Sequence, residues 1–301
     1  MTQAVIPQPD WQTVCPPDIC GSGGSDGSGL VVSGSGAGFA GIDLGECEAF
    51  AMMAGSSNTC AGGFDCDIIQ GHLGISPGTS ITGNFVANVL STPDSAGCAT
   101  DGLAALNAGK ARAGAVNMAA EMGGLTFTAG EYTHGSAINI ALANPQVFLD
   151  AEGDPNAVFI FNAGSTLVTC AHSEIVLLNG ARPENVYWIL GTALTLGHDS
   201  LFVGTILAGS SATINTNGQI CGRVIAQTSV TCATACTVGF LDGCWGQNLA
   251  TFMKPDCSCT APADPCSACP ANTRCQLSPT LMCIDCNCGF CDGGGAECCD
   301  S

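Results

Sequence analysis

Four histidines are the side chains best suited to metal or acid–base chemistry. They are His72, His134, His172 and His198, and no two of them have the HExxH spacing of a zinc protease. His172 and His198 are about one repeat of the surrounding sequence apart, so they can meet at a corner of a repetitive fold. We expect two solvated corner side chains there rather than a metal site, and we expect no cofactor.

Asp65 and Asp67, in the sequence DCD, form a carboxylate pair of the kind that β-helix glycosidases use. Enzymes that cleave acidic polysaccharides also need Lys or Arg to hold the substrate, and no basic residue accompanies this pair. The sequence contains neither a G-x-S-x-G elbow nor a P-loop. We therefore predict that the protein is not an enzyme.

Cysteine occurs 22 times, and 12 of these residues lie between residues 244 and 301. Two CxxC units, at 266–269 and 283–286, have a spacing compatible with a zinc site of four thiolates. The many further cysteines, their even number and the small apolar content of this segment favour disulfides. Both interpretations stay open. Disulfides imply an oxidising location, either extracellular or on the surface of a cell or particle, although no signal peptide is visible.

The charge balance excludes several classes of partner. The 301 residues include 6 Lys and Arg against 25 Asp and Glu, which gives a net charge of −19. Binding to nucleic acid or to anionic membranes needs clustered basic residues, so we expect neither partner. No run of 18 apolar residues appears, so we expect no membrane insertion. The 41 glycines fit a β architecture with tight corners.

A short repeat indicates the fold that positions these residues. The segment LTLGHDSLFVGTILAG (194–209) aligns without gaps on ATINTNGQICGRVIAQ (212–227), and a third copy begins at 230. A looser copy, LVTCAHSEIVLL (167–178), precedes them at an offset of about 26 residues. Stacked β-strand coils separated by Gly, Asn and Ser turns are typical of a β-solenoid, so we predict a mainly β protein.

One long helix is expected beside the coils. Residues 99–122 are rich in alanine, Thr100 or Asp101 can cap their start, and Gly123 and Gly124 can end them. The strand LFVGTILAG (201–209) is apolar on both faces, so it needs a cover on each. We predict that the solenoid core covers one face and the helix the other.

Two columns of hydroxyl side chains follow from the repeat. Side chains alternate across a strand, so a residue between two small or apolar neighbours faces outward. Alignment of the coils gives a central column of Thr169, Thr195, Thr213 and Thr231. A second column, three residues upstream, consists of Thr166, Thr192, Ser210 and Thr228. This array either only stabilises the strand ladder or forms a flat, weakly charged surface that matches a crystal lattice.

Several stretches resemble the microbial ice-binding protein family. They are GHLGISPGTSITG (71–83), MGGLTFTAGEYT (122–133), DPNAVFIFNAGSTLVT (154–169) and IVLLNGARPENVYWILGTALTLGHDSLFVGTILA (175–208). The resemblance covers about residues 40–240. It implies a right-handed discontinuous β-helix with a long helix alongside, and ice as the partner of one flat face.

Some members of that family carry a T-[AG]-x-[TN] repeat on the ice-binding face. The sequence TALT at 192–195 fits this pattern, and the corresponding stretches of the other coils fit it loosely. The resemblance therefore implies that Thr192 and Thr195 bind ice, followed by the other residues of the two columns, Thr166, Thr169, Ser210, Thr213, Thr228 and Thr231.

We expect three segments along the chain. Residues 1–38 are a Cys-containing, Gly/Ser-rich leader, residues 39–243 form the solenoid domain, and residues 244–301 are a Cys-rich tail. An alternative function stays open: the solenoid is a structural subunit of an extracellular filament, cell-surface layer or virion. In that case its ends stack on neighbours, and the Cys-rich extensions cross-link them by disulfides.

Overall fold

The computed structural model describes residues 31–34, 40–63, 65–87, 95–112, 115–141 and 145–239, and two short strands near the C-terminus. The chain divides into two compact units, Met1–Gly246 and Gln247–Ser301. Most of the leader, the predicted boundary at 243 and 244, and both CxxC units lie outside the described residues. In the second unit, β23 (Arg274–Cys275) pairs with β24 (Cys299–Asp300) in an antiparallel ladder.

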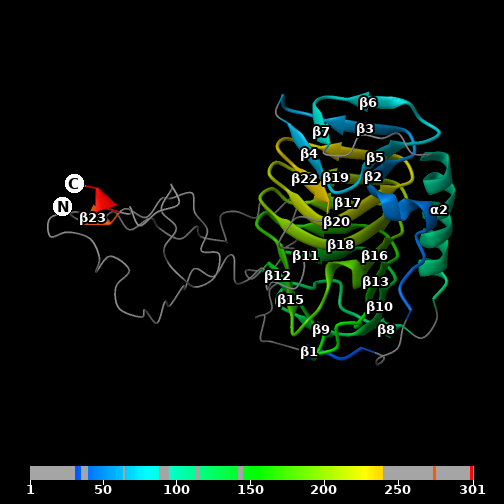
Figure 1. Cartoon of the computed structure of the whole chain (residues 1–301). Helices are drawn as coiled ribbons and strands as arrows, with labels where there is room; N and C mark the ends of the chain where they lie inside the picture. Colours follow the sequence, from blue (N-terminus) through cyan, green and yellow to red (C-terminus); the bar gives the residue numbers. More distant parts are fainter. Residues whose placement is uncertain are drawn as a thin grey trace. The chain divides into compact units, whose positions relative to one another are not determined.

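The first unit is a β-solenoid, as the repeats predicted (Figure 1). Every pairing between its described strands is parallel. Backbone hydrogen bonds therefore run from coil to coil, and each coil uses its neighbours to bury its apolar side chains. The gapless alignment is confirmed, because Gly204 pairs with Gly222 and Ile206 with Val224.

Two sheets form the walls of the solenoid. The larger has 15 strands: β1 (Val31–Val32), β2 (Phe50–Ala54), β4 (Cys66–Ile69), β5 (His72–Ile75), β7 (Phe85–Ala87), β8 (Val116–Asn117), β9 (Thr126–Thr128), β10 (Gly130–His134), β12 (Gln146–Asp150), β13 (Phe159–Ala163), β15 (Glu174–Leu178), β16 (Val186–Leu190), β18 (Leu201–Ala208), β20 (Gln219–Ala226) and β22 (Thr237–Gly239). The smaller has seven: β3 (Ser57–Cys60), β6 (Ser80–Thr82), β11 (Ile138–Ile140), β14 (Leu167–Thr169), β17 (Leu194–Leu196), β19 (Ser211–Ile214) and β21 (Ser229–Cys232).

The spatial order of the coils differs from their order in the sequence. β20 pairs on one side with β18 and on the other with β2, and β21 pairs with β3. The coils built from residues 50–87 therefore stack on the C-terminal coils rather than on the strands that follow them in the chain. This arrangement agrees with the discontinuous β-helix that the resemblance implied.

Helix α2 (Ser95–Lys110) is shorter than predicted and begins earlier. Thr100 lies inside it and donates a hydrogen bond to the carbonyl oxygen of Ala96, so Thr100 does not cap its start. The predicted end at residue 122 is wrong because residues 116–117 form β8, and Met118 and Met122 are buried in the solenoid core. Burial in the coils therefore outweighs the helix propensity of this alanine-rich stretch.

The predicted cover of the apolar strand is confirmed. Leu207 of β18 packs in one buried cluster with Ile189, Ile225 and the helix residues Ala105 and Leu106. Gly102 and Gly109 are buried on the same side of the helix, where a Cβ atom would meet Ile225 and Ile189 respectively. These glycines allow the helix to lie close to the larger sheet. No described helix has the length and apolar character needed to cross a bilayer.

A column of aromatic rings fills the solenoid core. Phe161 stacks on Trp188 with ring centroids 4.4 Å apart, and Tyr132 stacks on the other side of Phe161 at 5.2 Å. Trp188 also contacts Phe202 of the next coil, and its Nε1 donates to the carbonyl oxygen of Val203 at 2.9 Å. All these rings are buried. The stack fixes the coils against one another and keeps the walls rigid.

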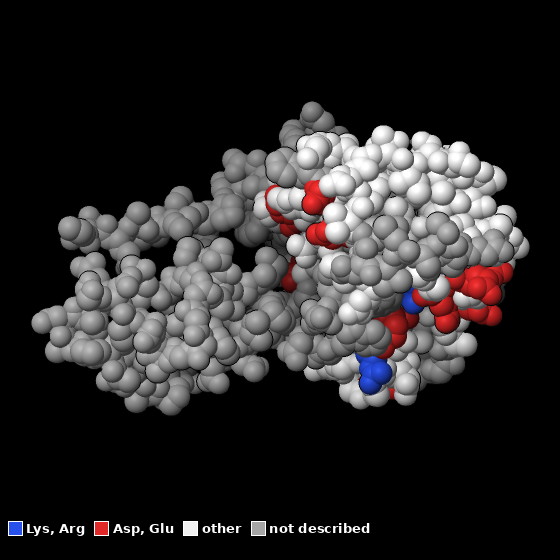
Figure 2. Space-filling view, turned by 45° about the horizontal axis from the view of Figure 1, so that its top comes forward, with Lys and Arg blue, Asp and Glu red and all other residues white. Residues whose placement is uncertain are grey.

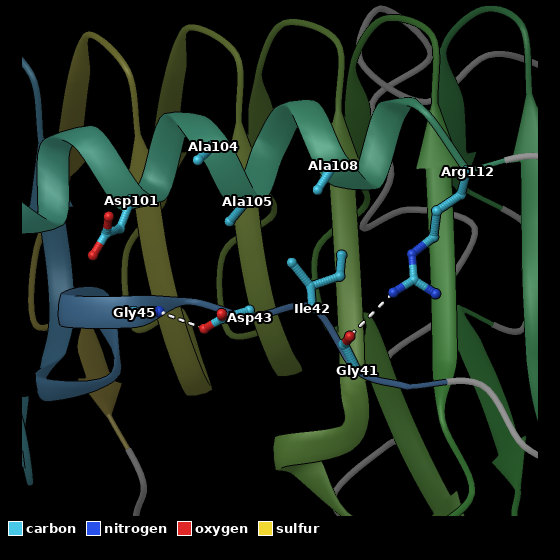
Figure 3. Close-up of a pocket in the computed structure, with 9 residues that line it drawn as sticks. All are labelled: Gly41, Ile42, Asp43, Gly45, Asp101, Ala104, Ala105, Ala108 and Arg112. Atoms are coloured by element: carbon cyan, nitrogen blue, oxygen red, sulfur yellow. Dashed lines mark hydrogen bonds between the residues drawn. The ribbon is translucent and has the colours of Figure 1, made fainter.

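The segment before β2 is fastened to α2 (Figure 3). Cys47, in the 3₁₀ helix Gly45–Ala49, forms a disulfide with Cys98. Arg112 donates to the carbonyl oxygen of Gly41, and the carboxylate of Asp101 accepts from the N–H of Glu46. The groove between segment and helix is lined mainly by alanine and glycine. Its charged residues Asp43, Asp101 and Arg112 each form a hydrogen bond with the backbone of the segment. It is therefore a structural junction.

Two further disulfides close corners of adjacent coils. Cys60 bonds to Cys66, and Cys232 bonds to Cys236. Cys60 and Cys232 lie opposite each other on β3 and β21, so the two bonds are neighbours in the stack. Disulfides therefore occur within the described part of the solenoid, whereas those predicted for residues 244–301 stay a prediction. A second 3₁₀ helix, Pro183–Asn185, precedes β16.

Candidate functional site

The smaller sheet presents hydroxyl groups in regular positions on successive strands. Its strands follow the order β11-β14-β17-β19-β21-β3-β6. Burial alternates along every strand except the end strand β6, which is exposed throughout. In β19, Ala212 and Ile214 are buried, and Ser211 and Thr213 are partly exposed. Apolar side chains therefore enter the core, and the hydroxyl side chains between them face outward.

Register aligns the outward side chains in columns. The central column consists of Thr195, Thr213, Thr231, Thr59 and Thr82, each opposite the next on paired strands. Two residues upstream, a serine column consists of Ser211, Ser229, Ser57 and Ser80. Strands in a sheet are ~4.8 Å apart and the columns are two residues, about 6.6 Å, apart along the strand. We call the two columns together the hydroxyl face.

A third column lies at the corner that precedes these strands. The backbone N–H of each member donates to the carbonyl oxygen of the previous one, and the members are Ser165, Thr192, Ser210, Thr228 and Ser56. The hydroxyls of Ser165 and Thr192 are 3.5 Å apart. We call these five residues the corner column.

Six of the eight residues predicted from the sequence occupy these columns. Thr195, Thr213 and Thr231 are consecutive members of the central column. Thr192, Ser210 and Thr228 are consecutive members of the corner column. Their contact with ice stays a prediction.

Thr169 was wrongly placed on the surface. It is 1% exposed, and its hydroxyl accepts a hydrogen bond from the N–H of Gly197 at 2.9 Å. Leu167 pairs with Leu194 and Val168 with Thr195, so the offset of this coil is 27 residues rather than 26. A slip of one residue moves every side chain of a strand to the opposite face, so Val168 takes the outward position.

The same slip moves Thr166 to another column. Because Leu167 pairs with Leu194, Thr166 lies level with Ala193. Ala193 is in turn level with Ser211, the first member of the serine column. Ser165 takes the place predicted for Thr166 beside Thr192. Thr166 is half-buried.

The sequence prediction missed the N-terminal half of the hydroxyl face. Ser57 and Thr59 of β3, and Ser80 and Thr82 of β6, extend both columns by two strands. A signal was present, because SNTC (57–60) matches SVTC (229–232) at three of four positions. Alignment at fixed offsets did not find it because these strands are far from the other coils in the sequence.

The hydroxyl face is uncharged. None of the seven strands of the smaller sheet contains Lys, Arg, Asp or Glu. Charged residues lie elsewhere: in the view of Figure 2, described acidic side chains gather in separate patches, and much of the described surface is white. Threonine and serine are short and have few rotamers, so the face presents hydroxyls and methyls in fixed positions.

His172 and His198 meet at a corner of adjacent coils, as the sequence suggested. Their ring centroids are 5.3 Å apart, and the N–H of His172 donates to the carbonyl oxygen of His198. Asp199 contacts His198 and accepts a hydrogen bond from the side-chain amide of Asn217. These hydrogen bonds, with that from Asn217 the largest cause, lower the pKa of Asp199 below its ordinary value.

Fold and site together define a β-solenoid protein in which one wall presents serine and threonine from strands without charged residues, and helix α2 packs against another wall. Residues 52–237 match the family model described as Ice-binding-like. The chain belongs to this family.

Named relatives and solved structures agree with this assignment. An ice-binding protein of Nostoc sp. (strain HG1) is 35% identical over 71% of this chain and 80% of its own length. An ice-binding protein of Flammulina populicola is 28% identical over 67% of this chain and 90% of its own length. The crystal structure of an ice binding protein from an Antarctic biological consortium superposes with a TM-score of 0.62 at 31% identity, covering 70% of this chain and 96% of that one.

Proposed function

We propose that this protein binds ice through the hydroxyl face and the corner column, and that it acts as an antifreeze or inhibitor of ice recrystallisation. The observation that carries the proposal is the register of Thr195, Thr213, Thr231, Thr59 and Thr82 on five successive strands. Five identical side chains at one strand spacing form a regular row on a wall without charge. Relatives and structural neighbours named as ice-binding proteins support the same function.

Two physical properties suit the face to a crystalline ligand. Regular spacing in two directions, ~4.8 Å between strands and about 6.6 Å along them, lets many hydroxyls and methyls contact a lattice at once. Each contact is weak, but a rigid face loses little conformational entropy on binding, so the contacts add up. The aromatic stack and the disulfide-closed corners supply this rigidity.

The absence of Lys and Glu from the seven strands serves the same function. A long charged side chain holds its own hydration shell and samples many rotamers, and both properties oppose close contact with a crystal. Thr and Ser present hydroxyls near the backbone, where the ladder fixes their positions. A ladder-stabilising role alone does not require that all seven strands lack charge.

An oxidising, extracellular setting accompanies this function. All eight cysteines of the described solenoid are disulfide-bonded, and such bonds persist outside the reducing cytosol. In this setting the protein meets ice outside the cell. The alternative of a filament or surface-layer subunit receives no comparable support from the relatives.

The test is thermal hysteresis and recrystallisation inhibition by the full-length protein. Thr195→Tyr with Thr213→Tyr should abolish both activities, because two bulky rings would hold the lattice away from the face. The matched control is Thr100→Tyr, which places the same ring on the exposed surface of α2, beside the other wall. Circular dichroism should show all variants folded. If the folded, unmodified protein leaves ice growth unchanged, the proposal is wrong.

A further inference from the structure

The corner that follows β14 and β17 brings together three side chains with metal-binding atoms. The chain turns at His172 and at Asp199, which adopt positive φ values of 57° and 53°. The coils stack there through backbone hydrogen bonds: His172 N–H donates to the carbonyl oxygen of His198, and Asp199 N–H to that of Thr216. Two adjacent coils therefore supply the imidazoles of His172 and His198 and the carboxylate of Asp199 at one place.

The distances between these groups suit one shared ion. One donor atom from each of His172, His198 and Asp199 lies within 4.8 Å of the others. His198 Nδ1 and Asp199 Oδ2 share a hydrogen bond of 2.7 Å, which a bound ion would replace with its own bonds to the two groups. The rings of His172 and His198 meet edge to face, 78° from parallel, so their nitrogens are not aligned in one plane.

The surroundings hold the carboxylate in place and leave the site accessible. Asn217 Nδ2 donates to Asp199 Oδ1 at 2.8 Å, which orients Asp199 in the way that neighbouring groups orient metal ligands. The side chains of His198 and Asp199 are 49% and 38% exposed, and His172 is half-buried. An ion can therefore reach the cluster from solvent without any opening of the fold.

We propose that His172, His198 and Asp199 form a surface site for a divalent transition-metal ion of the Zn²⁺, Cu²⁺ or Ni²⁺ type. Two imidazole nitrogens and one carboxylate oxygen match the donors preferred by these ions, whereas Ca²⁺ and Mg²⁺ require more oxygen ligands. Three protein ligands leave further positions for water. The bound ion links the coil of β14 to the coil of β17, because its ligands come from both.

The first experiment measures binding of Zn²⁺ alone to the full-length protein without reductant, by calorimetry. The expected result is one equivalent that is lost, or weakened at least about tenfold, in His172→Asn with His198→Asn. His134→Asn is the matched control, since the His134 ring contacts the carbonyl oxygen of Met118 outside the cluster. Equal Zn²⁺ binding by the double variant and the unmodified protein would overturn the proposal.

A second measurement separates this site from cysteine thiolates, which are numerous in the chain. Co²⁺ or Cu²⁺ bound at the corner should show nitrogen coordination, seen for Cu²⁺ as superhyperfine splitting from imidazole nitrogen in electron paramagnetic resonance. Thiolate-to-metal charge-transfer absorption as the only signal would contradict the proposal.

Asp199→Asn, which retains a side chain able to accept a hydrogen bond from Asn217, should weaken metal binding while the melting temperature in EDTA stays unchanged. If Asp199→Asn binds the metal ion as tightly as the unmodified protein does, Asp199 is not a ligand of the site.

Discussion

Thr59 lies directly opposite Thr231 on paired parallel strands, although the two residues come from opposite ends of the folded domain. This pairing places the N-terminal strands β3 and β6 at the end of the row that Thr195, Thr213 and Thr231 begin. The hydroxyl face is therefore assembled from two separate parts of the chain, and its area depends on their correct stacking.

The first prediction concerns this N-terminal contribution. Thr59→Tyr should lower thermal hysteresis several-fold, because Thr59 lies inside the row and a ring there would lift the lattice from its neighbours. Thr82→Tyr should have a smaller effect, because β6 is the last strand of the sheet and Thr82 is an exposed end member. Equal activity of Thr59→Tyr and the unmodified protein would restrict the binding surface to the C-terminal coils.

The second prediction separates stability from ice binding by a pair of identical substitutions. Thr169→Val should reduce the free energy of unfolding by about 1–3 kcal/mol, because the buried N–H of Gly197 loses its acceptor. Thermal hysteresis should persist under all conditions in which this variant is folded. Thr213→Val should do the reverse, with stability changed by no more than about 0.5 kcal/mol and ice activity reduced.

Urea unfolding and thermal hysteresis on both variants check this crossover. The opposite pattern, with Thr169→Val folded but inactive, would mean that Thr169 acts at the surface despite its burial. Val168→Thr offers a further control, because it extends the central column by one member without altering the buried hydrogen bond.

The fold was predictable from the sequence where repeats were close and regular. The offset of 18 residues fixed the register of β17, β19 and β21, and with it Thr195, Thr213 and Thr231. The predicted alignment of β14 was wrong by one residue. Offsets of 26 and 27 residues give almost the same sequence similarity over so short a strand. Only the backbone pairing of Val168 with Thr195 decides between them.

Other features depended on contacts distant in sequence. Local propensity favours a helix through residue 122, but burial of Met118 and Met122 in the core ends it at Lys110. Stacking of β3 on β21 joins coils that no local repeat connects. The meeting of His172 and His198 was predictable from the repeat, whereas the proximity of Asp199 to both histidines is known only from the structure.

The third prediction concerns pH. Burial raises the pKa of Glu174 above its ordinary value, against the smaller opposing effect of the hydrogen bond from Gln146. Its Oε1 has no hydrogen-bond partner among the described residues. A carboxyl of this kind contributes stability fully below its unfolded pKa of about 4.5, and the contribution is lost as pH rises through the higher folded pKa.

Glu174→Gln should therefore be more stable than the unmodified protein at about pH 8, and the difference should shrink as pH falls toward about 5. The glutamine can still accept from Gln146 through its amide oxygen. Thermal melting of both proteins across this range measures the difference, in which the titration of all other groups cancels. A difference that grows on acidification would contradict the assigned direction of the pKa shift.

The fourth prediction concerns the fastening of the helix. Cys47 and Cys98 are both fully buried, and their disulfide closes a loop with a sequence separation of 51. Cys47→Ala with Cys98→Ala should lower the free energy of unfolding by about 2–4 kcal/mol, since the unfolded chain gains conformational freedom. Urea unfolding without reductant measures this loss of stability.

Thermal hysteresis of the same variant, measured well below its melting temperature, should be retained, because α2 covers the larger sheet and the hydroxyl face lies on the smaller one. A folded variant without ice activity would show that the helix and the hydroxyl face are structurally coupled.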